Sequence, residues 1–213
     1  MNRIRHHYSL LPPVIKLLLV SNGVIFLLEM FFANILFSNF ALWPLAADYL
    51  QSTDPQLHSF MPWQLFSYAF LHGSVMHLLL NMYGLWIFGV GLENLWGSRT
   101  FAIYYFVCVL GAGVTQIFVS SMAGDYYPTI GASGGVFGVL LAFGLFFPNQ
   151  VLILLIPPMP IKAKWFVIIY GAIELWFGVT GTEAGVAHFA HLGGMLFGLI
   201  TIYYWQSHPP KKL

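Results

Sequence analysis

Long apolar runs dominate the pattern of this chain, and shorter, more polar segments separate them. A helix that crosses a membrane needs about 20 mostly apolar residues. Six runs reach or approach that length, and they cover about 14–37, 74–92, 100–122, 132–148, 163–180 and 186–205. The pattern therefore predicts an all-α, polytopic membrane protein that folds as a bundle of six transmembrane helices.

Two of the connecting segments differ from ordinary solvated loops. The segment from about 38 to 73 is rich in tryptophan and proline, and aromatic residues of this kind favour the membrane interface. We expect it to be a long outer loop that lies at the interface or dips partly into the membrane. The segment VLILLIPPMPIKAK is apolar but too short to cross, and three prolines interrupt it. We expect it at the membrane surface.

Composition supports this picture and narrows the possible partners. Only 7% of the residues are charged and 59% are hydrophobic, whereas about 25% are charged in a typical soluble domain. The formal net charge of +1 argues against a nucleic acid partner, so the lipid bilayer is the expected environment. No shift in composition marks a second domain, and we expect residues 1–213 to form one membrane domain.

The basic residues predict how the chain lies in the membrane. If the N-terminus is cytoplasmic and the chain crosses six times, all eight basic residues fall on the inner side. They are Arg3, Arg5, Lys16, Arg99, Lys162, Lys164, Lys211 and Lys212. Because positive charge concentrates on the cytoplasmic side of membrane proteins, both termini are predicted to be cytoplasmic. The compact chain and this charge bias also favour a bacterial inner membrane.

Polar side chains on three of the predicted helices fall at a similar depth. In this topology His77 and Asn81 lie near the outer end of the second span, Ser133 near that of the fourth, and His188 and His191 in the outer third of the sixth. Polar groups in hydrocarbon are costly unless they find partners, so we expect them to face one another. A serine beside a histidine is an activated nucleophile, and His77 and Asn81 could donate hydrogen bonds to an oxyanion.

Glycines near these polar residues predict close helix packing. Gly134 and Gly138 follow Ser133 at the spacing GxxxG, and Gly194 and Gly198 follow His191 in the same way. Small residues at this spacing let helix backbones approach closely. The glycines around Ser133, including Gly131, also permit a sharp turn and leave the serine at a helix N-terminus, where free N–H groups stabilise an anion.

The acidic residues offer no obvious third member for a catalytic triad. Glu29 and Glu174 lie within predicted spans, and each is either functional or a structural hydrogen-bonding group. The simpler prediction is a dyad of Ser133 and His191, without metal or cofactor. The histidines on the second and sixth spans could instead bind a metal ion, although such a site would make no use of Ser133.

Three sequence motifs resemble the rhomboid family of intramembrane serine proteases. The motif HGSVMHLLLN contains His77 and Asn81, GASG contains Ser133, and AHLGGMLFG contains His191 with its following glycines. They occur in this order on the second, fourth and sixth predicted spans. The resemblance covers nearly the whole chain, in the bare six-span form of the family.

The resemblance implies a mechanism and a class of substrate. Ser133 matches the nucleophile of the family and His191 the general base. Phe137 stands where the family often has a tyrosine whose ring stacks under the catalytic histidine, and we expect that stacking here. The resemblance further implies hydrolysis of peptide bonds in transmembrane proteins, which enter sideways from the lipid.

Two other functions are compatible with the sequence. The first is a non-catalytic relative that binds membrane proteins as clients and assists their turnover, although such a protein should lack Ser133 or His191. The second is a membrane protein that binds metal through its histidines. Sensitivity to a chelator would distinguish the metal-binding protein from the protease.

Overall fold

The computed structural model describes residues 8–45, 58–154, 157–181 and 186–210. Six long helices make up most of it: α1 (Pro13–Phe40), α3 (Val75–Trp96), α4 (Ser98–Ala123), α5 (Ser133–Phe146), α6 (Ala163–Thr180) and α7 (His188–Ser207). Each predicted apolar run coincides with one of these helices, and no boundary differs by more than four residues. The predicted all-α bundle is therefore present in the described part of the chain.

Four of the long helices, α1, α3, α4 and α6, have the length and composition to cross a membrane. Helix α5 is apolar but has only 14 residues, and α7 has 20 residues but begins with two histidines in its first turn. The structure thus supports a multi-pass membrane protein with four clear candidate spans. The six-span topology and its orientation remain predictions.

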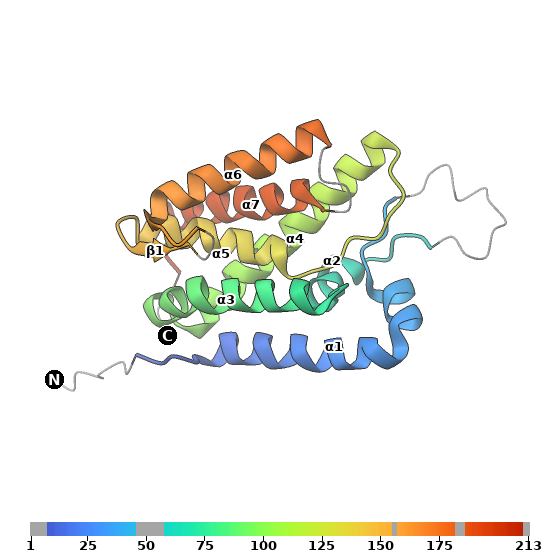
Figure 1. Cartoon of the computed structure of the whole chain (residues 1–213), viewed down its shortest axis with the longest axis horizontal. Coiled ribbons are helices and arrows are strands. Elements are labelled where there is room, and N and C mark those ends of the chain that lie inside the picture. Colours follow the sequence, from blue (N-terminus) through green and yellow to red (C-terminus); the bar gives the residue numbers. More distant parts are fainter. Residues whose placement is uncertain (1–7, 46–57, 155–156, 182–185, 211–213) are drawn as a thin grey trace.

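The helices are arranged around α5 and α7 (Figure 1). Helix α6 covers one side of the bundle, α1 forms the opposite side, and α3 and α5 lie between them. Helix α7 packs most extensively on α4 and α5. Ten of the fourteen residues of α5 are buried, so this short helix is enclosed by longer neighbours and needs little contact with lipid.

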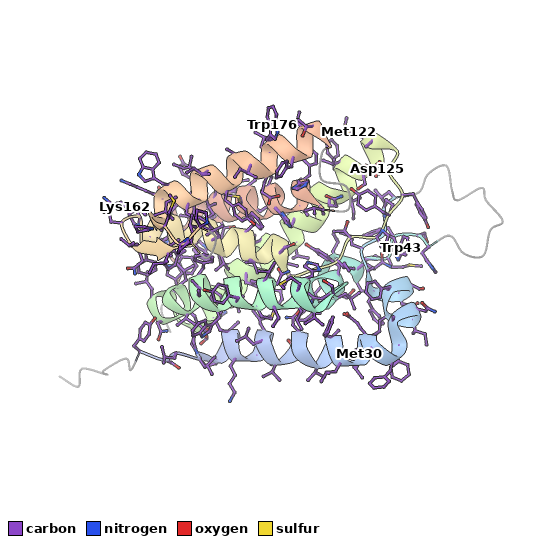
Figure 2. All side chains as sticks on the ribbon, in the orientation of Figure 1. Met30, Trp43, Met122, Asp125, Lys162 and Trp176 are labelled. Atoms are coloured by element: carbon purple, nitrogen blue, oxygen red, sulfur yellow. The ribbon has the colours of Figure 1, made fainter. Side chains whose placement is uncertain are left out.

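The four Lys and Arg residues in the described part of the chain lie at one end of the bundle. Lys16 and Arg99 lie in the first turns of α1 and α4, and Lys162 and Lys164 stand at the start of α6. Asp125 follows α4 at the opposite end, as the labels for Lys162 and Asp125 in Figure 2 show. The common end of the basic residues agrees with the predicted topology. Arg3, Arg5, Lys211 and Lys212 are outside the described residues.

A buried amide joins two parts of the segment between α1 and α3. The Gln64 side chain is 1% exposed and lies in the short helix α2 (Gln64–Ser67), which precedes the 3₁₀ turn η2 (Tyr68–Phe70). Its Oε1 accepts hydrogen bonds from the backbone N–H groups of Trp43 at 3.2 Å and Met61 at 3.1 Å. Residues 46–57 of the predicted loop 38–73 lie outside the described residues.

The segment between α5 and α6 contains a hairpin that the sequence did not predict. Strand β1 (Val151–Ile153) pairs antiparallel with β2 (Pro160–Lys162). The hairpin lies at the end of the bundle where α1 begins and α7 ends (Figure 1). It covers the segment predicted to lie at the membrane surface, and its three-residue strands are too short to give a clear alternating pattern.

Candidate active site

Ser133 is the first residue of α5. The preceding chain is held by an isolated antiparallel bridge between Leu42 and Thr129 and by a hydrogen bond from the N–H of Gly131 to the carbonyl oxygen of Tyr68 at 2.9 Å. Gly131 has φ +117°, a backbone conformation that a side chain would strain. The glycine therefore permits the turn that leaves the serine at the start of the helix.

His191 lies in the first turn of α7 and faces Ser133. Its Nε2 is 2.8 Å from Oγ of Ser133, which is a hydrogen-bond distance. The two backbones approach closely because both helices present glycine here, and a Cβ atom on Gly194 would collide with the carbonyl oxygen of Gly134. The structure thus brings together the serine and the histidine that the sequence placed at a similar depth.

An aromatic ring supports the imidazole of His191. The ring of Phe137, one turn after Ser133 on α5, stacks on it with a centroid separation of 4.2 Å and an interplanar angle of 6°. The ring of Tyr170 on α6 continues the stack, 5.2 Å from that of Phe137. The stacking expected of Phe137 is therefore present, and it restricts rotation of the imidazole out of its plane.

The other nitrogen of His191 contacts a carboxylate that the predicted dyad did not include. Nδ1 of His191 lies 2.8 Å from Oε2 of Glu174 on α6, and Nδ1 of His188 lies 2.7 Å from the same oxygen. The sequence offered no obvious third member beside Ser133 and His191, because depth alone does not show which way α6 is turned. A usable signal was present, since Gly171 and Gly178 flank Glu174 on one helical face.

His77 lies near Ser133 but on another helix. A Cβ atom on Gly131 would stand 2.7 Å from Nε2 of His77 and 3.6 Å from Oγ of Ser133. The bare Cα of Gly131 thus leaves a space that both side chains border. Asn81 is buried one turn further along α3, and its Nδ2 donates a hydrogen bond to the carbonyl oxygen of His77 at 2.9 Å. Only one of the two amide protons is used in this bond.

The second intramembrane acid, Glu29, is bonded away from the serine. Its Oε1 accepts a hydrogen bond from the backbone N–H of His72 at 3.0 Å, and the ring of His72 lies 5.0 Å from that of His77. Glu29 therefore fastens α1 to the segment that leads into α3. Its contact is to backbone, which fits a structural role.

The cluster of Glu174, His188 and His191 is also the place where a metal ion would bind. One ligand atom from each residue lies within 4.8 Å of the others, and all three residues are buried. Tetrahedral zinc places its ligand atoms about 3.3 Å apart. The two nitrogen-to-oxygen distances of 2.7 and 2.8 Å are shorter than this, so the arrangement fits hydrogen bonding better than coordination.

Comparisons with known proteins agree on one family. A family model described as the Rhomboid domain matches residues 59–207. Rhomboid protein 1, mitochondrial, from Saccharomyces cerevisiae is 30% identical over 146 residues, which cover 68% of this chain and 42% of that protein. Presenilin-associated rhomboid-like protein, mitochondrial, from Homo sapiens is 33% identical over 158 residues, covering 67% and 39%. The chain thus matches less than half the length of these relatives.

Proposed function

Because this chain belongs to the rhomboid family, we propose that it is an intramembrane serine endopeptidase that cleaves transmembrane segments of other membrane proteins. The observation that carries the proposal is the pair of Ser133 and His191, whose Oγ and Nε2 atoms are 2.8 Å apart. A hydroxyl bonded to an imidazole nitrogen is the arrangement of an activated nucleophile. The family resemblance of the sequence motifs is confirmed by the match over residues 59–207.

The proposed reaction proceeds in two steps. Ser133 Oγ attacks the substrate carbonyl carbon while His191 Nε2 takes its proton, and the tetrahedral intermediate collapses as His191 returns that proton to the leaving amine. Water then attacks the acyl-enzyme with His191 again as base, which frees the new carboxyl end and Ser133. The negative oxygen of each intermediate would be stabilised by the N–H of Ser133 at the start of α5, and by His77 and Asn81.

The position of the serine limits the substrates. If the chain crosses six times with both termini cytoplasmic, the end of the bundle that carries Ser133 faces the outer side of the membrane. A peptide bond inside an intact helix is shielded by its neighbours, so the cut segment must unwind. We expect substrates that enter from lipid and carry small or helix-weakening residues near the outer membrane face.

The comparisons also bear on which membrane holds this protein. The multi-pass character rests on four candidate spans. Both relatives described above are named as mitochondrial proteins, so they give no support to the bacterial inner membrane predicted from the sequence. A non-catalytic client-binding relative would not need the bond between Ser133 and His191, so it explains less of the site.

We test the function with a fluorophosphonate probe. Oγ of an activated serine attacks the phosphorus and expels fluoride, so the wild-type protein in proteoliposomes should become labelled at Ser133. The same preparation should cleave a single-span reporter substrate, and EDTA should change neither result. Loss of cleavage in EDTA with recovery on adding Zn²⁺ would favour the metal-binding protein, and absence of both labelling and cleavage would favour the client-binding one.

The stack under His191 gives a second prediction. Phe137→Leu should lower kcat about 3- to 10-fold, because leucine keeps apolar volume but has no flat face, and such ring contacts contribute about 0.5–1.5 kcal/mol. KM should stay close to that of the wild type. Kinetics on the reporter substrate measure both constants.

The matched control is Phe143→Leu on the same helix. Phe143 is 7% exposed, as is Phe137, but its ring packs on Phe88 and Phe147 instead of on a histidine. This variant should lose some stability and keep kcat. An equal fall of kcat in both variants would show that the stack has no special role.

A further inference from the structure

We propose that Glu174 is a positioning residue that holds the general base His191 in its working tautomer and orientation. The inference rests on the proposed function, and it replaces the predicted dyad by three residues from three helices. Ser133 comes from α5, His191 from α7 and Glu174 from α6. Their atoms form a continuous chain of two contacts, each 2.8 Å long.

The first argument comes from proton placement. An ionised carboxylate has no hydrogen to donate, so it can only accept hydrogen bonds. Oε2 of Glu174, 2.8 Å from Nδ1 of His191, therefore requires the proton of the neutral imidazole on Nδ1. The lone pair is then on Nε2, which faces Oγ of Ser133 at 2.8 Å. This is the tautomer that can take the proton of the serine.

The second argument concerns the buried charge itself. The side chain of Glu174 is 6% exposed, and an unpaired carboxylate at such a place in a membrane protein is costly. His188 supplies a second donor, because its Nδ1 lies 2.7 Å from the same oxygen. Two N–H groups on one carboxylate oxygen stabilise its charged form and fix its direction. His188 thus has a place in the site without contacting Ser133.

The third argument comes from the exposure of α6. Only Ala163, Val167 and Glu174 are buried in this helix, so Glu174 is its one buried residue after position 167. On the same face, Gly171 and Gly178 let the helix approach Met195 and His188 of α7. Trp176 is 65% exposed and points away from α7 in Figure 2.

Through these contacts the position of α6 affects the tautomer of the general base His191. The half of α6 that follows Val167 meets α7 at glycines, at one carboxylate and at the ring of Phe177, which lies 5.7 Å from that of His188. If this half moved away from α7, His191 would lose the acceptor for its Nδ1 proton. The base would then be free to adopt the other tautomer, whose Nε2 carries hydrogen and cannot accept the proton of Ser133. Docking of α6 is therefore a condition for catalysis.

The test is Glu174→Gln in the whole chain of residues 1–213, measured on the reporter substrate in proteoliposomes. Glutamine has almost the same shape, but its amide group can donate to Nδ1 of His191 and so stabilise the wrong tautomer. We expect kcat to fall about 10²- to 10⁴-fold, with KM within about threefold of the wild type. Labelling of Ser133 by the fluorophosphonate should slow in parallel with kcat.

Glu174→Asp separates positioning from simple folding. Aspartate restores the charge but is one methylene shorter, so it should recover at least tenfold in kcat over glutamine. The matched control is Glu93→Gln. Glu93 is 2% exposed, and it bonds the backbone N–H groups of Val14 and Ile15 at the start of α1. Its substitution should lower the unfolding temperature and leave the kcat of the folded protein unchanged.

Each outcome decides between the inference and its alternatives. The inference is overturned if Glu174→Gln keeps the wild-type kcat, if aspartate recovers nothing over glutamine, or if EDTA removes wild-type cleavage and Zn²⁺ restores it. The proposed function fails separately, if Ser133→Ala cleaves as fast as the wild type. If Ser133→Ala abolishes cleavage but Glu174→Gln keeps the wild-type kcat, the role of Glu174 is rejected and the proposed function stands.

Discussion

Replacing Ser133 or His191 by alanine is expected to lower kcat about 10⁴- to 10⁶-fold, and replacing both should cost no more than the larger single loss. The reason is that the two side chains act as one unit. Without His191 the proton of Ser133 has no acceptor, and without Ser133 the base has nothing to activate. The residual rate would come from binding and from oxyanion stabilisation. Release of product from the reporter substrate measures all three variants and the wild type.

Two controls keep this result specific. Ser120 is a buried serine on α4 whose Oγ accepts a hydrogen bond from Gln116, and Ser120→Ala should keep kcat within a few-fold. His208, just past the end of α7, stacks on Tyr204, and His208→Ala should behave in the same way. Losses that multiply in the double variant would show that Ser133 and His191 act independently, contrary to the proposed mechanism.

Gly194→Ala should also have a large effect, although it adds a single methyl group. That methyl would collide with the carbonyl oxygen of Gly134, and a backbone atom cannot move aside by changing rotamer. Helices α5 and α7 would have to separate, which would lengthen the 2.8 Å contact between Ser133 and His191. We expect kcat to fall at least about 10²-fold, because a misplacement near 1 Å can cost that much, and stability to fall by about 1–3 kcal/mol.

The control for this substitution is Gly23→Ala. Gly23 is also inside a helix, but a Cβ atom there would meet nothing within 4 Å. The added methyl should leave kcat unchanged and stabilise α1 slightly, because alanine is the better helix former. Thermal unfolding and cleavage rates of both variants are compared with the wild type. If Gly194→Ala cleaved within threefold of the wild type, close backbone contact would not be what sets the serine–histidine distance.

The sequence predicted the helices and the main pair of the site for a simple physical reason. A helix in hydrocarbon must be long and apolar, so apolar runs mark helices directly, and all six coincide with helices here. Depth along a span follows from counting residues. Ser133, His77 and His191 could therefore be placed near one another without knowledge of how the helices are rotated.

The features that could not be predicted from the sequence depend on how each helix is rotated about its axis and on the hydrogen bonds of single side chains. Glu174 reaches His191 only because one face of α6, with Gly171 and Gly178, turns toward α7. Span counting gives a depth for Glu174 but no direction. For Asn81, one amide proton is bonded to the carbonyl of His77, a detail that no spacing in the sequence reveals.

If the proposed cleavage takes place at Ser133, the shortness of α5 influences which peptide bond is cut. Its 14 residues extend about 21 Å, roughly 9 Å less than the hydrocarbon thickness of a membrane. Ser133 at its first residue is thus recessed below the surface that the longer helices reach. Because the depth of Ser133 is fixed, the residue of an entering segment that reaches it is the one that lies at that distance from the bilayer surface. In a thicker bilayer the same protein would meet a different residue of the same substrate, so lipid composition becomes part of sequence specificity.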